Sequence, residues 1–290
     1  MALRQRREEE RAWRDLGDGG RDPVRSAGDR HQPPLVQGVD RDPRDLGGVH
    51  PHDLGQRRLG VLLGEAGPLA DEVADGGGRA DVLPADLADR QVRAALPDRI
   101  AALGVSADIL VNNAGFSTVG RVSEADPDRE MAMVEVDVVA VVDLCTRLLP
   151  GMVGRGRGAV LNVASTAAFQ PLPGQAGYGA GKAFVLSYTQ SLVGELKGSG
   201  VTATCLCPGP VHTGFGERAG FSKEDAEAAL PSVMWVDAPA VAKAAVAGLD
   251  RGRMVVIPGA ANRVAASLAQ ITPRSLLMPV LRTHPGLRRD

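Results

Sequence analysis

Residues 158–182 read GAVLNVASTAAFQPLPGQAGYGAGK. The apolar run Ala159–Ala164 predicts a buried strand, and the glutamines, prolines and glycines after Ser165 predict a loop. A helix is expected from about Tyr178 to Lys197. This stretch therefore predicts a strand, a loop and a helix in succession, which is the repeating unit of α/β proteins.

The same alternation extends to both sides of this stretch. We expect helices at residues 68–75, 89–103 and 128–152, and strands at residues 80–84, 109–111, 201–207 and 254–257. Strands that are apolar throughout and separated by helices are typical of a parallel sheet covered on both faces. Right-handed crossovers then predict an α/β fold with a doubly wound, Rossmann-like sheet in three layers, which binds its ligands at the carboxyl ends of the strands.

The composition is that of a soluble globular protein. Of 290 residues, 44% are hydrophobic and 23% are charged, and the formal net charge is −2. This balance favours neither nucleic acid nor an acidic membrane surface as a partner, and no apolar run has the length of a transmembrane segment or a signal peptide. The three cysteines, Cys145, Cys205 and Cys207, are expected to be free and buried. We therefore predict a cytoplasmic protein without a metal site.

Residues 1–60 differ from the rest of the chain. Short mixed groups of Arg, Asp, Gly, Pro and His show neither a helical nor a strand period, so we predict an irregular or disordered segment. Residues 61–262 are expected to form the Rossmann-like domain. The tail 263–290 is apolar with scattered arginines, and its prolines argue against one long helix. It is interpreted as a helix closing the pocket, a subunit contact or a membrane-surface element, and the sequence does not decide between them.

Three polar residues have the spacing that proton transfer requires. Tyr178 and Lys182 are four apart, so a helix places them on one face, one turn from each other. A phenol titrates near a pKa of ~10, and a neighbouring ammonium lowers that value. Ser165 ends a strand and can hydrogen-bond the reacting oxygen. Alternatively, the tyrosine and lysine are a surface pair and the serine is a turn residue.

Four motifs resemble the short-chain dehydrogenase/reductase family in their order and spacing: NNAG at 112–115, Ser165, YGAGK at 178–182 and PGPVHT at 208–213. The resemblance covers about residues 69–259. It implies that Tyr178 is the general acid–base, that Lys182 lowers its pKa and binds the nicotinamide ribose, and that Ser165 positions the substrate oxygen. It also implies a carbonyl or secondary alcohol substrate, NADP (or NAD) as cofactor, and a homo-oligomer formed through the two long helices.

The resemblance assigns cofactor contacts as well. Beside Tyr178 and Lys182, it places three groups of residues around the cofactor: Asp86 and Leu87 at the adenine, Asn113, Ala114 and Gly115 at the adenosine ribose, and Pro208, Gly209, Val211 and Thr213 at the nicotinamide.

Asp137 departs from the family pattern. It stands in the long helix before Ser165, where the family has an asparagine that holds a water linked to the lysine. A carboxylate can hold the same water and adds a negative charge near Lys182. We predict that Asp137 keeps the proton relay and shifts the pH optimum; the alternative is a helix aspartate without a catalytic role.

The second departure is the missing glycine-rich turn. The family opens with a strand, a TGxxxGxG turn and a helix whose N-terminus receives the cofactor pyrophosphate. At the corresponding place, residues 31–41 read HQPPLVQGVDR, and no glycines at i, i+4 and i+6 occur before Asn112. One hypothesis is that residues 1 to about 60 are an off-frame reading of a GC-rich gene, and the other is an unusual natural N-terminus. The nucleotide sequence decides between them.

The missing turn leaves two hypotheses for the function. The first is an oxidoreductase that moves a hydride between a nicotinamide cofactor and a carbonyl or alcohol. The second is a protein of the same fold that cannot bind cofactor. An apolar set of residues suggests a lipophilic substrate, although core packing explains them equally well: Phe169, Phe215, Phe221, Met234 and Trp235.

Overall fold

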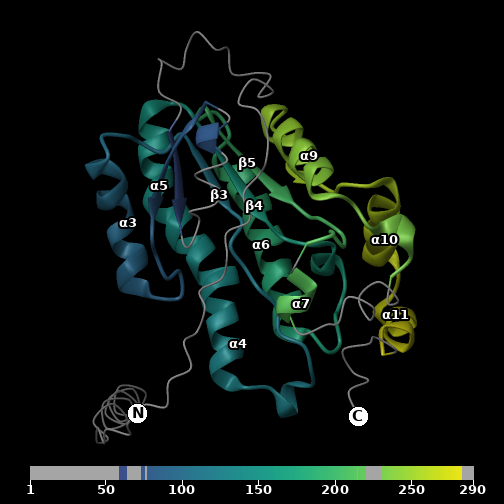
Figure 1. Cartoon of the computed structure of the whole chain (residues 1–290). Helices are drawn as coiled ribbons and strands as arrows, with labels where there is room; N and C mark the ends of the chain where they lie inside the picture. The colour runs from purple at the N-terminus through teal and green to yellow at the C-terminus, as the bar shows by residue number, and fades with distance from the viewer. Residues whose placement is uncertain (1–58, 64–72, 76, 214, 220–229, 283–290) are drawn as a thin grey trace, which may run out of the picture. The chain divides into compact units, whose positions relative to one another are not determined.

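Strands alternate with helices through most of the chain that the structure describes (Figure 1). A computed structural model gives residues 59–63, 73–75, 77–213, 215–219 and 230–282, all of them within the second of two units, Pro33–Asp290. The strands are β1 Leu59–Leu63, β2 Arg79–Leu83, β3 Ile109–Asn112, β4 Gly158–Val163, β5 Val201–Leu206 and β6 Val255–Val256. The helices of eight or more residues are α3 Arg90–Ala102, α4 Pro127–Val134, α5 Ala140–Arg155, α6 Ala176–Glu195, α9 Ala238–Asp250, α10 Ala260–Ile271 and α11 Arg274–Leu281.

The strands β3 to β6 form one parallel sheet that has helices on both faces. Their order is β3-β4-β5-β6. Val160 and Leu161 are consecutive on β4, so their side chains point to opposite faces. Val160 packs in the main core together with residues of α5 and α6, whereas Leu161 packs in a second core with residues of α9. The three-layer α/β fold is therefore confirmed.

The strands do not form one continuous sheet in the part of the chain that the structure describes. β1 pairs in parallel with β2, and these two strands are a sheet separate from β3–β6. The predicted Rossmann-like parallel fold is confirmed, and β1 is a strand that the sequence did not predict. The separation follows from the absence, among the described residues, of a strand that joins the β1–β2 pair to β3.

One face of β3 has little cover. Ile109 and Val111 are 50% and 46% exposed, while Leu110 between them is buried. Val111 is in register with Leu161, so the exposed side chains lie on the α9 side of the sheet. In a parallel sheet both faces are normally buried. In the described part of the chain, this face of β3 is therefore only partly covered.

Buried polar groups connect the layers. The Asn112 amide donates to the Asn162 side-chain oxygen at 2.8 Å, and the Asn162 amide donates to the Thr189 hydroxyl of α6 at 3.0 Å. On the other side of α5, the buried Arg93 of α3 forms ion pairs with Glu135 and Asp143, both at 3.1 Å. Because buried polar groups are costly when unpaired, these networks fix α3, α5 and α6 relative to the strands.

The bounds of the other predicted helices and strands agree with the structure within a few residues, with two exceptions. The helix expected at 68–75 lies mostly outside the described residues, and only Val73–Asp75 are seen, in helical conformation. The long helix expected at 128–152 consists of α4 and α5 joined by a π-helical turn, Glu135–Val139. The tail forms two helices, α10 and α11, separated at Thr272 and Pro273.

Candidate active site

Ser165 lies at the carboxyl end of β4, where the chain leaves the sheet. It is the N-cap of the short turn Thr166–Phe169, and its Oγ accepts a hydrogen bond from the Ala167 amide at 3.1 Å. The Ser165 hydroxyl also lies 3.5 Å from the Pro208 carbonyl oxygen. These contacts hold the hydroxyl at the edge of the sheet, beside the segment that follows β5.

Tyr178 and Lys182 lie on the first turns of α6, and both are buried. The Lys182 Nζ donates to the Val163 carbonyl at 3.2 Å, which is two residues before Ser165. The ammonium lies 5.6 Å from the centre of the Tyr178 ring. The Ser165 side chain is near enough to the Tyr178 phenol to lower its pKa. The helix and the end of β4 therefore bring Ser165, Tyr178 and Lys182 into one cluster.

Asp137 lies in the π-helical turn between α4 and α5. One carboxylate oxygen accepts from the Phe116 amide at 3.0 Å, and the other lies 3.0 Å from the Lys182 Nζ. A π-helical turn is rare and occurs often at functional sites because its extra residue redirects a side chain. Asp137 thus joins the cluster as an ion-pair partner of Lys182.

Gly115 leaves the space that Asp137 occupies. A Cβ at this position would lie 2.8 Å from the Asp137 Oδ1, which is too close for a real contact. The close approach of the Ala114–Phe116 backbone to the carboxylate requires glycine at this point. This gives a physical reason for the last residue of the NNAG motif.

The charges of the cluster are coupled. Burial raises the pKa of Asp137, although the Lys182 ammonium acts against this shift. Burial by itself lowers the pKa of Lys182, but the Asp137 carboxylate and the Tyr178 phenolate raise it above its usual value. Burial also raises the pKa of Tyr178, and Lys182 opposes this while Asp137 adds to it. Without a further positive charge, the buried phenol therefore keeps its proton.

The segment after β5 lies beside Ser165. The Thr166 amide donates to the Pro208 carbonyl at 2.8 Å, and the Val236 amide donates to the Pro210 carbonyl at 3.0 Å. The Thr213 hydroxyl lies 3.4 Å from the Phe215 amide, at the start of α7 (Phe215–Ala219). The predicted nicotinamide-contacting residues Pro208, Gly209, Val211 and Thr213 are therefore on a segment fixed next to the cluster.

Asn262 of α10 is a site residue that the sequence did not indicate. It is fully buried, and its amide donates to the Met234 carbonyl at 2.9 Å and to the Pro258 carbonyl at 3.1 Å. A Cβ at position 209 would overlap the Asn262 carboxamide, so the glycine of the PG turn is pressed against it. No spacing rule connects residues 209 and 262, and only the packing of α10 reveals the contact.

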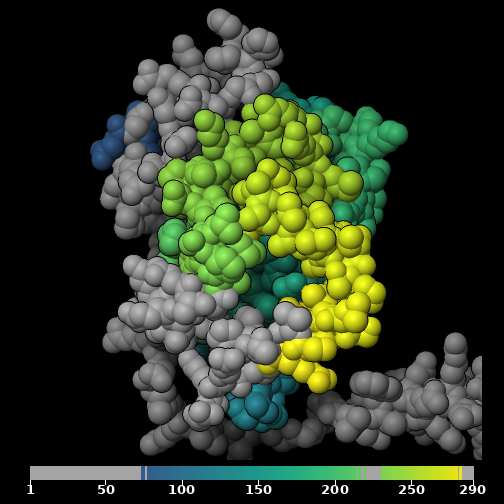
Figure 2. All heavy atoms as spheres, turned by 90° about the vertical axis from the view of Figure 1, so that its right-hand side faces the viewer, coloured from purple at the N-terminus to yellow at the C-terminus, as the bar shows by residue number. Residues whose placement is uncertain are grey.

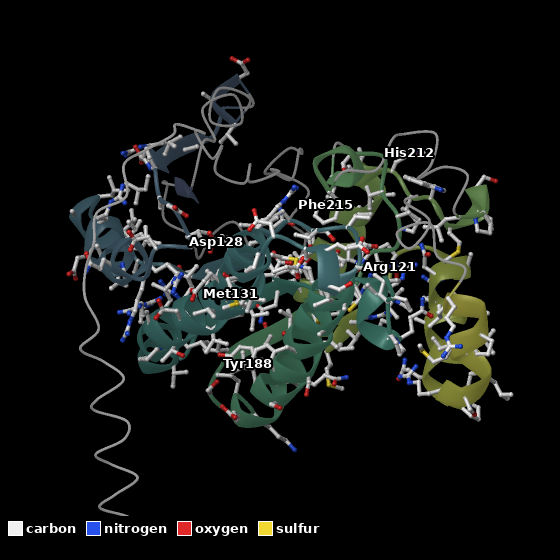
Figure 3. The ribbon with its side chains drawn as sticks, turned by 90° about the horizontal axis from the view of Figure 1, so that it is seen from below. Arg121, Asp128, Met131, Tyr188, His212 and Phe215 are labelled. Carbon is white, nitrogen blue, oxygen red and sulfur yellow. The ribbon has the colours of Figure 1, made fainter. Side chains whose placement is uncertain are left out.

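Aromatic side chains surround this edge. The Phe215 ring lies 5.8 Å from the Tyr178 ring, and the His212 ring stacks on Trp235 at 4.7 Å. Figure 3 shows Phe215 and His212 on the segment that follows β5. The other predicted substrate contacts lie in different places. Phe169 is buried in the main core, the Met234 backbone carbonyl accepts a hydrogen bond from Asn262, and Phe221 lies outside the described residues.

The predicted adenine contacts lie after β2. The Asp86 carboxylate accepts from the Ala88 amide at 2.8 Å and caps the turn, and Leu87 is buried in the main core. The Leu87 side chain is therefore a packing residue in this structure. Asn113, Ala114 and Gly115 follow β3 directly and lead to Phe116. The roles of all these residues toward a cofactor stay predictions.

A family model described as short chain dehydrogenase matches residues 61–223. The chain belongs to this family. Residues 1–60, which differ in composition, lie outside the match. Nodulation protein G of Rhizobium sp. (strain N33) is 30% identical over 220 residues, which are 73% of this chain and 88% of that protein. No helix in the described part of this dehydrogenase is long and apolar enough to cross a membrane.

Solved structures agree with this assignment. A short-chain dehydrogenase from Sphingobium yanoikuyae in complex with NADPH is 29% identical, with a TM-score of 0.62, covering 78% of this dehydrogenase and 87% of that chain. The bulky-bulky ketone specific alcohol dehydrogenase from Comamonas testosteroni is 25% identical, with a TM-score of 0.59, covering 78% and 86%. The likeness holds although the described strands of this dehydrogenase form two sheets.

Proposed function

We propose that this short-chain dehydrogenase transfers a hydride between NADP(H) and a lipophilic carbonyl or secondary alcohol, with Tyr178 as the general acid–base. The observation that carries the proposal is the buried cluster in which Lys182 lies beside the Tyr178 ring and pairs with Asp137, with Ser165 near the phenol. Three separate elements supply these side chains: the segment that follows β4, α6 and the π-helical turn. Strongly coupled titratable groups that gather at the carboxyl end of a parallel sheet are typical of an active site.

Each residue of the cluster has a distinct task. The Ser165 hydroxyl donates to the substrate oxygen and orients it toward Tyr178. During reduction the Tyr178 phenol gives its proton to that oxygen, and during oxidation the phenolate takes the proton back. The Lys182 ammonium stabilises the phenolate, and Asp137 keeps Lys182 charged in its buried position.

The residues of the site fit a nicotinamide cofactor only in part. When bound, the nicotinamide cofactor supplies or accepts the hydride. The Lys182 ammonium and the Pro208–Thr213 segment are suited to hold the nicotinamide and its ribose. The sequence offers no TGxxxGxG turn for the pyrophosphate before Asn112. The choice of NADP is supported by the Sphingobium relative, whose structure contains NADPH.

A lipophilic substrate is supported by the aromatic side chains around Tyr178. Phe215 packs against the Tyr178 ring, and the His212–Trp235 stack lies on the two segments that bridge at Val211 and Val236. The resemblance to a dehydrogenase specific for bulky ketones points in the same direction. An apolar ligand gains most of its binding energy from such surfaces.

A second candidate function is a protein of this fold that does not bind cofactor. The separation of β1–β2 from β3–β6 favours it, because the family's pyrophosphate turn should lie between these two sheets. The two candidates differ in one measurable property, the binding of a reduced nicotinamide.

Titration with NADPH and with NADH tests the proposal. The full chain is titrated while energy transfer from tryptophan to the bound cofactor is followed, and Trp235 lies next to the proposed nicotinamide segment. We expect saturable binding, with NADPH tighter than NADH. In Tyr178→Phe, binding should persist while turnover of aromatic ketones falls by a factor of about 10²–10⁴. A folded chain that binds neither cofactor would instead establish the second candidate.

The proposal includes a homo-oligomer. Met131 of α4 and Phe184 of α6 are large apolar side chains exposed to solvent, and Phe184 stacks on Tyr188 at 6.0 Å. Figure 3 labels Met131 and Tyr188 on these helices. Such a patch on helices that bear the active site is suited to a subunit contact. Light scattering of the full chain and of Phe184→Asp tests it, and a monomer in both cases would refute it.

A further inference from the structure

The C-terminal helices expose an apolar stripe. Val264, Leu268 and Ile271 recur at i, i+4 and i+7 on α10, which places them on one face. These three and Leu276 of α11 are between 54% and 77% exposed. The opposite face of α10 already packs inward through Asn262, Ala266 and Ala269. Packing therefore explains one face of α10, and among the residues that the structure describes the stripe is left exposed.

The charge around the stripe has one sign. From residue 251 to residue 282 the sequence contains five arginines, no lysine and no acidic residue, although the whole chain has a net charge of −2. Arg263, Arg274 and Arg282 lie along α10 and α11 and are exposed. The charged side chains of the helices that carry the apolar stripe are thus all positive.

This charge decides between two occupants. A second copy of the chain would bring the same patch against itself, because a two-fold interface is self-complementary, and the arginines would repel each other. An anionic lipid surface satisfies both features, since apolar side chains enter the headgroup boundary while arginines bind lipid phosphates. We infer that the surface formed by Val264, Leu268, Ile271 and Leu276 with Arg263 and Arg282 docks the protein on an anionic lipid bilayer.

The docking surface is tied to the active site. The Arg274 guanidinium donates to the Phe169 carbonyl at 3.3 Å and to the Ala269 carbonyl at 3.2 Å, so α11 is fixed to the turn that follows Ser165. Figure 2 shows α10 and α11 (yellow) beside a hollow whose floor is formed by teal atoms from the middle of the chain. Docking would hold this hollow next to the lipid. The inference concerns binding to the bilayer and does not depend on the proposed activity.

Co-sedimentation with lipid vesicles tests the inference. The full chain is mixed with phosphatidylcholine vesicles that contain or lack phosphatidylglycerol, at low and at high salt. We expect sedimentation with the anionic vesicles, and weaker binding at high salt because salt screens the arginines. The double variant Leu268→Asp/Ile271→Asp should lose binding, and Arg263→Glu should weaken it about tenfold.

A matched control separates docking from general effects. Val122→Asp introduces the same charge at a side chain that is 70% exposed and lies outside α10 and α11. It should bind vesicles like the unmodified chain, and circular dichroism should show that all variants are folded. Three results would overturn the inference: no binding to anionic vesicles, equal binding to neutral vesicles, or binding that the stripe variant retains. A dimer that Leu268→Asp/Ile271→Asp dissociates would assign the stripe to a second copy instead.

Discussion

The Lys182 Nζ lies 3.0 Å from a carboxylate oxygen of Asp137, and both side chains are buried. A buried ion pair beside a reactive phenol affects the pKa of that phenol, because the two charges act on it in opposite directions. An asparagine in place of Asp137 would leave Lys182 with the same neighbours but without the counter-charge. We therefore expect the ion pair to affect the proton chemistry of Tyr178.

Asp137→Asn should move the pH dependence of alcohol oxidation. The Asp137 carboxylate raises the pKa of Tyr178, so its removal lowers that pKa. Oxidation needs the phenolate, and the rising limb of the pH–rate profile should shift to lower pH while Lys182 stays protonated. The exposed Asp128→Asn on α4 is the control and should leave the profile unchanged. An unchanged profile in Asp137→Asn would remove Asp137 from the site.

Removing one partner of the Lys182–Asp137 ion pair should lower the free energy of unfolding more than removing both charges. Lys182→Met leaves a buried carboxylate without its cation, which destabilises a protein by about 3–5 kcal/mol. The double variant Lys182→Met/Asp137→Asn removes both charges and should recover much of that loss. Urea unfolding of the two single variants and the double variant measures the coupling. Additive losses would show that the two side chains do not interact in solution.

Neighbouring residues of β3 should differ in their contribution to stability. Leu110→Ala creates a cavity in the main core and should lower the free energy of unfolding by about 2–5 kcal/mol. Val111→Thr changes a half-exposed side chain on the other face and should have an effect within about 0.5 kcal/mol. Thermal unfolding of both variants tests this. A large loss in Val111→Thr would mean that the α9-side face of β3 is covered.

Asn262→Ala should loosen the segment that is proposed to line the nicotinamide. It leaves the Met234 and Pro258 carbonyls without a donor, which costs about 1–3 kcal/mol, and it opens space next to Gly209. We expect a lower melting temperature and weaker NADPH binding. Gln270→Ala, at an exposed position on the same helix, is the control. Equal NADPH affinity in both variants would limit Asn262 to a structural role.

The sequence by itself determined the α/β fold, the family and the elements that carry Ser165, Tyr178 and Lys182. These follow from local signals: apolar runs of strand length, a four-residue spacing on a helix, and motifs that stand in a fixed order. It also placed Asp137 near Lys182, through the position of the family's asparagine. The composition of residues 1–60 correctly marked the part outside the family match.

The tertiary structure alone decided how distant segments meet. Asn262 presses on Gly209, although the two residues are far apart in sequence. The separation of β1–β2 from β3–β6 and the outward apolar face of α10 likewise depend on which elements pack together. The sequence shows the local conformational preference of each residue, but its burial and its strand pairing depend on which parts of the fold pack against it. For this reason the strand Leu59–Leu63 and the exposed apolar face of α10 could be identified only from the structure.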